Sequence, residues 1–276
     1  MGNFNIASKV LDRKSDIVKD ALNKIKAKDM DSRLERLAEA KERLWTENVP
    51  VIRTDDRSLV GILGDGRFKN YLETGHTNGG EGNGSGIHRR LTESANFGKY
   101  TNDSDRPIYG YMEHPYTKNP SVAEKEGRLG SDLTMYGNVK FYPKRDFTRK
   151  TSTFTLGDSE FDGNYPLRWD AEDWQAFARK SEADNPKSKM YIYPNDRTAI
   201  RLNSAADKDW FDNNAWAELQ FHDGVSLDDI ASVTIPENIR SKIRNQAIEA
   251  ANRYGFRLDE EDLNEIVKRC LANCLE

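Results

Sequence analysis

The spacing of hydrophobic residues changes along this chain, from helical at both ends to strand-like in the middle. Residues 7–45 carry apolar side chains three and four positions apart, which predicts two amphipathic helices. The same spacing after Pro236 predicts two more. Short β-prone runs separated by Gly, Asn and Asp fill the middle. We therefore expect an α+β chain with three parts: an N-terminal helical segment (1–48), a central domain (49–236) and a C-terminal helical segment (237–276).

The composition favours a folded protein that binds neither nucleic acid nor a membrane. Of the 276 residues, 32% are charged, but 11 Tyr, 11 Phe and 5 Trp supply the apolar area that disordered chains lack. The formal net charge is -4 and the charges of both signs are mixed, unlike a nucleic-acid-binding surface. No apolar run approaches the roughly 20 residues of a membrane span, and the first residues lack the apolar core of a signal peptide.

The two cysteines also favour a reducing compartment. Cys270 and Cys274 lie four residues apart in a predicted helix, where the geometry suits a disulfide poorly. We therefore expect a cytoplasmic protein, with delivery into a host cell as an open alternative.

Three runs predict strands of the central domain, and one Gly-rich stretch predicts a loop. The strand candidates are Asn138–Tyr142, Thr151–Leu156 and Ala215–His222. Residues 77–106 contain the sequence GGEGNGSG and few apolar side chains, which predicts a mobile loop of the kind that covers substrate sites.

The last of these runs carries the candidate catalytic residues. Its side chains alternate, so Glu218, Gln220 and His222 should share one face of a strand while Leu219 and Phe221 face the core. A carboxylate, an amide and an imidazole in a row are typical of a reactive surface. Cross-strand polar pairing is the alternative explanation.

Two further stretches predict contacts to a phosphate or a nucleotide. An arginine can hold a phosphate with two hydrogen bonds, and glycine lets the backbone approach a ligand. Simple turns with a surface arginine are the alternative. The candidate binding residues are Arg57, Glu73, Gly75, His76, Asn78, Ser152, Thr153, Asp158 and Ser159.

These motifs, taken in order, resemble a bacterial and phage family catalogued as domain of unknown function 3626, and related modules attached to phage head-morphogenesis proteins. The resemblance extends from about Thr54 to Ile235. The matching stretches are Asp56-Arg57, Leu72–Gly75 with Asn78–Gly80, Arg106–Gly110, Tyr136-Gly137, Thr153–Ser159 and Glu218–His222.

A looser resemblance links the chain to ADP-ribosyltransferases of the Arg-Ser-Glu class. Those enzymes carry an arginine on an early strand, a Ser-Thr-Ser-like strand and a catalytic glutamate on a later strand. Arg57, the Thr151–Thr153 run and Glu218 occur in that order. Trp216 stands where those enzymes often carry Glu or Gln, so arginine-directed transfer is not implied.

The resemblance implies an ADP-ribosyltransferase-like mixed sheet and a toxin-like or phage-encoded enzyme that uses NAD as a substrate. ADP-ribose would pass to a macromolecular acceptor, which we expect to be a protein, and no metal would be needed. Glu218 would stabilise the oxocarbenium-like transition state, with Arg57 on the pyrophosphate and Ser152 or Thr153 beside Glu218. Gln220 and His222 would shape the acceptor side. We expect Glu218, Arg57 and Ser152 to meet in one cleft.

Two other functions stay open at this stage. The chain could be a non-catalytic structural or interaction module that contacts a phage head or a partner chain through its N-terminal helices. It could also be a hydrolase that uses Glu218 and His222 as an acid–base pair. Their roots would lie about 13 Å apart along one strand, which makes direct cooperation awkward.

Overall fold

The computed structural model describes the central part of the chain in most detail. The described residues are 42, 44–46, 48–75, 85–97, 100–113, 136–156, 168–169 and 217–260. The predicted N-terminal helices up to residue 41, the second C-terminal helix, Trp216 and both cysteines lie outside them.

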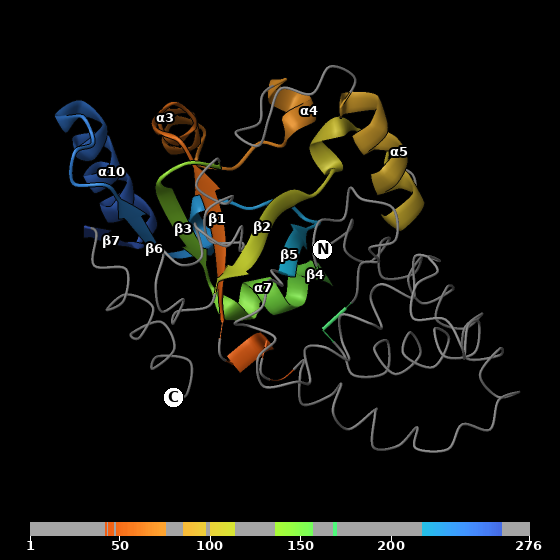
Figure 1. The fold of residues 1–276 in the computed structure, drawn as a ribbon. Helices are drawn as coiled ribbons and strands as arrows, with labels where there is room; N and C mark the ends of the chain where they lie inside the picture. The colour runs from red at the N-terminus through yellow and green to blue at the C-terminus, as the bar shows by residue number, and fades with distance from the viewer. Residues whose placement is uncertain are drawn as a thin grey trace, which may run out of the picture.

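A seven-stranded sheet organises the described residues, in the spatial order β4-β5-β2-β1-β3-β6-β7 (Figure 1). The β6–β7 pair is parallel and the other pairs are antiparallel. The predicted mixed α+β class is thus confirmed in its coarse form. The strands are β1 (Val49–Thr54), β2 (Ile108–Glu113), β3 (Val139–Pro143), β4 (Ser152–Leu156), β5 (Ala217–Phe221), β6 (Ile230–Ile235) and β7 (Arg257–Glu260).

The three strands predicted from sequence are all present. They are β3, β4 and β5, and their ends agree with the predicted runs within a few residues. Each run combines aromatic or β-branched residues with alternation, which is the pattern that a pleated strand needs when its two faces differ.

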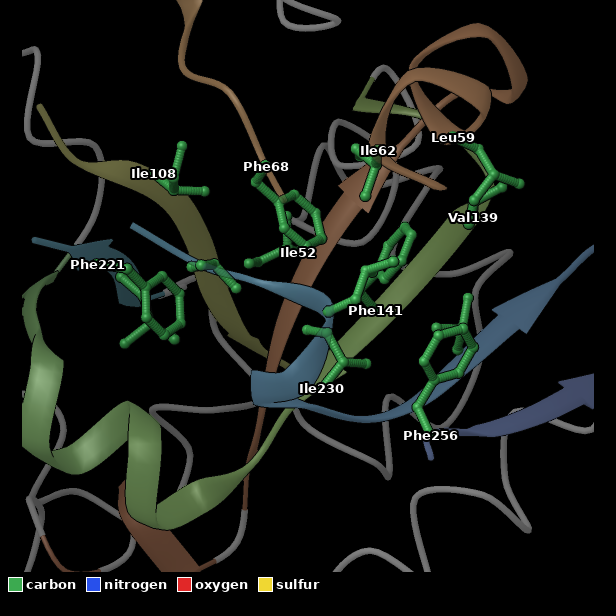
Figure 2. Packing of buried hydrophobic residues seen from close by; sticks show 14 of the residues in the cluster. Ile52, Leu59, Ile62, Phe68, Ile108, Val139, Phe141, Phe221, Ile230 and Phe256 are labelled. Atoms are coloured by element: carbon green, nitrogen blue, oxygen red, sulfur yellow. The ribbon is translucent and has the colours of Figure 1, made fainter. Parts of the chain in front are cut away.

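One face of the sheet is apolar and carries the hydrophobic core. Ile52, Phe141 and Val233 occupy neighbouring positions across β1, β3 and β6, and their side chains belong to one buried cluster. Figure 2 shows Leu59 and Ile62 of a helix packed beside Ile52 and Phe141.

Three helices cover this apolar face. They are α3 (Asp56–Asp65), α7 (Arg145–Thr151) and α10 (Ser241–Tyr254), and each adds side chains to the core or packs against it. Phe147 of α7 stacks on Phe221, with ring centroids 5.9 Å apart. The apolar face is therefore closed by helices, and any polar chemistry belongs to the opposite face.

Local signals fix both ends of α3. The Asp55 side chain accepts a hydrogen bond from the Ser58 backbone N–H, which satisfies one of the free donors of the first turn. Gly66 ends the helix in the left-handed conformation, with φ 71°.

The C-terminal part differs from the predicted appendage. Helix α10 lies within the predicted range, but its buried residues Ile243, Ala247 and Ala250 belong to the main core. The chain then adds β7 to the sheet beside β6. Residues 237–260 are therefore part of the central unit, because the amphipathic helix buries its apolar face against the sheet.

The prediction of a loop over residues 77–106 is wrong for its second half. Residues 85–97 form helix α5 (Ser85–Phe97), and η1 (Asp103–Asp105) is a short 3-10 turn. The sequence has few apolar residues here because α5 is anchored by the buried charged residue Glu93 together with Phe97. Residues 77–84 lie outside the described part.

Gly137 is required where the chain enters β3. Its φ is +109°, and a Cβ at this position would lie 2.1 Å from the Thr54 carbonyl oxygen. We expect Gly137→Ala to lower the free energy of unfolding by about 3 kcal/mol or more, because backbone strain and a steric clash add together.

The matched control is Gly64→Ala on α3. A Cβ there meets nothing within 4 Å, so alanine should raise the free energy of unfolding by about 0.5 kcal/mol. Urea unfolding of both variants measures the difference, and equal effects would show that the close approach at Gly137 does not matter.

Candidate functional site

The predicted alternation of β5 places its polar residues on the face opposite the core. Glu218 lies directly opposite Tyr111 of β2 and Thr155 of β4, whereas Leu219 belongs to the core cluster. Gln220 lies between Tyr109 and Thr153. Glu218, Gln220 and His222 are all buried, with 7%, 0% and 0% of their surface exposed. The predicted shared face is confirmed.

A directed chain of hydrogen bonds joins these residues. The Gln220 Nε2 amide donates to Glu218 Oε1 at 2.8 Å and to Thr155 Oγ1 at 2.9 Å. Its Oε1 is therefore the end that accepts from the Thr153 hydroxyl, at 2.9 Å. That hydroxyl has one proton, so His222 Nε2, 2.8 Å away, must be the donor to Thr153. The chain runs from His222 to Glu218, and Gln220 holds the carboxylate in place.

His222 is neutral and serves as a fixed donor. Burial lowers the pKa of His222 to about 3, although the Asp223 carboxylate works in the opposite direction. Its ring also packs edge-on against Phe97 of α5, with centroids 4.6 Å apart. Burial therefore keeps the ring neutral near neutral pH, and the role of His222 in proton transfer stays a prediction.

A second carboxylate reaches the same face from α5. Glu93 is 2% exposed, and its two oxygens accept from the Tyr109 hydroxyl at 2.9 Å and from Arg106 Nη1 at 2.8 Å. Burial raises the pKa of Glu93, against these two hydrogen bonds, which lower it. Tyr109 lies opposite Gln220, so this cluster anchors α5 beside the Glu218 site.

The polar face continues across the middle of the sheet as an ionic network. Arg53 of β1 donates from Nε to the Tyr111 hydroxyl at 2.6 Å, and Lys140 Nζ lies 2.6 Å from Glu113 Oε1. Arg53 Nη2 also lies 3.6 Å from Glu113. Burial lowers the pKa of the Lys140 ammonium; Glu113 opposes this effect and Arg53 adds to it. Tyr111 of this network lies opposite Glu218 in the pairing of β2 and β5.

Of the two predicted binding residues that the structure describes on the hydroxyl-rich strand, Thr153 lies on Glu218's face and Ser152 does not. Ser152 faces the core: its hydroxyl donates to the Thr148 carbonyl at 2.6 Å and accepts from the Trp169 indole at 3.1 Å. The alternation that places Thr153 beside Gln220 necessarily turns Ser152 to the other side. Ser152 therefore cannot brace Glu218, contrary to the expectation.

Arg57 is also not brought to Glu218. It is exposed in the first turn of α3, two residues before the buried Leu59. At about 100° per residue, its side chain points nearly opposite to Leu59, away from the core. The expected meeting of Arg57, Ser152 and Glu218 is therefore not seen. Arg53 of β1, in contrast, lies on Glu218's face and bonds to Tyr111.

The predicted binding residues Glu73 and Gly75 have local structural roles. Glu73 pairs with Arg67 at 2.6 Å and completes a capping box with Asn70 at the start of α4 (Tyr71–Thr74). Gly75 ends that helix with φ 70°. The remaining predicted binding residues lie outside the described part, namely His76, Asn78, Asp158 and Ser159.

Sequence reasoning missed most of the polar face. Its missed members share one signal, namely a polar or phenolic side chain at every second position of a strand. The runs Tyr109, Tyr111, Glu113 on β2 and Lys140, Tyr142 on β3 show it. Glu93 gave no such signal, because a helix brings it to the face from outside the sheet.

Comparison with known proteins adds no family to this geometry. Neither a scan of protein-family models nor a search of curated proteins found a match. Within the described ranges, no group of three or more His, Cys, Asp or Glu could hold a metal ion. The described helices are all too short or too polar to cross a membrane.

The low pKa of His222 predicts an acid-sensitive fold. The unfolded chain takes up a proton on this ring near pH 6.5, and the folded chain does so only near pH 3. The His222 contribution to stability is therefore full above about pH 6.5 and is lost as the pH falls, by up to about 1.4 kcal/mol per unit.

His222→Gln should flatten this dependence. Chemical unfolding at pH 7, 6 and 5 measures the slope for both proteins. Because glutamine can still donate to Thr153 but takes up no proton, the variant should lose less stability on acidification. Identical slopes would contradict the assignment.

Proposed function

We propose that this protein cleaves the bond between nicotinamide and ribose in NAD and transfers ADP-ribose to a macromolecular acceptor. One observation carries the proposal: Glu218 of β5 and Arg53 of β1 share one face of the sheet, and Tyr111 of β2 lies opposite Glu218 and bonds to Arg53. An arginine on the first strand and a glutamate on a later strand are the elements that the Arg-Ser-Glu resemblance implies. Arg53 replaces Arg57 in that role.

The chemistry needs a fixed carboxylate beside the reacting ribose. As the carbon–nitrogen bond breaks, nicotinamide leaves with the electron pair and the ribose gains oxocarbenium character. A carboxylate can stabilise that charge and orient the ribose through the 2'-hydroxyl. Glu218 is suited to this because Gln220 holds one of its oxygens at 2.8 Å, which fixes the orientation of the carboxylate.

The other residues would act by positioning. Arg53 would hold the diphosphate through its planar fork of donors. Gln220, Thr153 and His222 would keep Glu218 in one orientation through their hydrogen-bond chain. His222 would not act as the base for the acceptor, because its pKa of about 3 makes it a weak one.

The acceptor is expected to be a protein, and a phage-encoded or toxin-like effector is the kind of protein that carries such chemistry. The alternative, a non-catalytic module, gains support from the burial of the network, since a buried polar network can serve stability alone. The two functions predict opposite effects of a change at Glu218.

Glu218→Gln separates them. If Glu218 stabilises the transition state, the variant should release nicotinamide from NAD at least about 100-fold more slowly than the wild type, since electrostatic groups of this kind contribute that much. Its melting temperature should stay close to wild type, because glutamine keeps the shape. The protein is incubated with labelled NAD and a bacterial lysate. Free nicotinamide then measures cleavage, and labelled acceptors measure transfer. A folded wild type that neither binds nor cleaves NAD would favour the structural module.

A pair of arginine variants tests the reassignment from Arg57 to Arg53. Arg53→Lys should raise KM for NAD about tenfold, because lysine loses the two-pronged geometry. Arg57→Ala should leave KM within about twofold of wild type, because Arg57 is an exposed helix residue. The reverse result would return the binding role to Arg57.

A further inference from the structure

Two buried hydroxyls on β6 have no hydrogen-bond partner among the described residues. Ser232 and Thr234 are 1% and 2% exposed, and neither Ser232 Oγ nor Thr234 Oγ1 is bonded to any residue that the structure describes. Burying a hydroxyl without a partner costs free energy, so a pair of them side by side points to a bound group that satisfies both.

The strand register places these hydroxyls on the polar face. Val233, between them, belongs to the apolar core, so Ser232 and Thr234 face the other side. Thr234 lies opposite Lys140 of β3, and Ser232 lies beside Arg257 of β7. The two hydroxyls therefore lie on the strand between Lys140 and Tyr142 of β3 on one side and Arg257 of β7 on the other.

A carboxylate pairs with each of these two cations. Asp259, beside Thr234, accepts from Arg257 Nε at 2.7 Å. Glu113 binds Lys140 Nζ, but it belongs to β2, three strands from β6. At about 4.8 Å per strand, the backbones of β2 and β6 lie roughly 14 Å apart, so Glu113 does not compete for the hydroxyls. Lysine has a flexible stem, and its three donors can serve a carboxylate and a second anion together.

We propose that Ser232, Thr234, Lys140 and Arg257 form a subsite for a phosphate group. The hydroxyls donate to phosphate oxygens, and Lys140 and Arg257, each also paired with a carboxylate, supply further charged donors. The subsite lies two strands from Arg53 in the order β1-β3-β6 and extends the anion-binding surface away from Glu218. It rests on the proposed function only for the expectation that a nucleotide carries the phosphate.

The test measures binding of inorganic pyrophosphate and of ADP-ribose to the full chain by calorimetry, so it does not depend on catalysis. The double variant Ser232→Ala/Thr234→Val should weaken binding of both probes about tenfold. It should also melt at a higher temperature than wild type without a ligand, because two unpaired buried hydroxyls are gone. Lys140→Met should weaken binding by a similar factor.

Lys69→Met is the matched control, since Lys69 is exposed and forms a surface ion pair with Asp65 of α3. Its affinity for both probes should equal wild type. No binding of either probe by wild type would overturn the subsite, even if the protein cleaves NAD. Loss of stability in the double variant with unchanged affinity would also overturn it, because the hydroxyls would then be structural. Binding that depends on these residues supports the subsite even if NAD is not cleaved.

Discussion

The buried polar face of the sheet imposes the strongest constraint on this structure. A donor or acceptor on that face loses its contact with water, so it must find a partner on the same face. Gln220 meets this demand most fully: its amide bonds to Thr153, Thr155 and Glu218, and so ties two strands together. The position of Glu218 is a consequence of this bonding.

The apolar face of the sheet carries the hydrophobic core, and the polar face carries the proposed site. On the apolar face, α3, α7 and α10 bury a single core, and small changes in shape there act on stability. On the polar face, Glu93 on α5 bonds to Tyr109, which lies opposite Gln220, and Arg53 on β1 bonds to Tyr111, which lies opposite Glu218. Because a rigid core fixes the strands, the polar side chains keep one arrangement, which a reactive site requires.

Burial changes what the individual residue types can do. His222 would titrate near neutral pH at a surface, but here it is a neutral donor to Thr153. Lys140 has a lowered pKa from burial, and Glu93 a raised one. Ser232 and Thr234 of β6 are buried hydroxyls of this face with no hydrogen bond to a described residue, which is why they are the basis of the proposed ligand site.

The sequence by itself determined three strands and the split between their faces, because alternation with period two is a local property of the chain. It placed Glu218, Gln220 and His222 together for the same reason. It could not choose between Arg53 and Arg57, which lie four residues apart on a strand and a helix, or foresee that Ser152 faces the core. Nor could it place Glu93, 125 residues before Glu218, against Tyr109. Only the tertiary structure decided these, because strand order, helix docking and burial depend on contacts between residues far apart in the sequence.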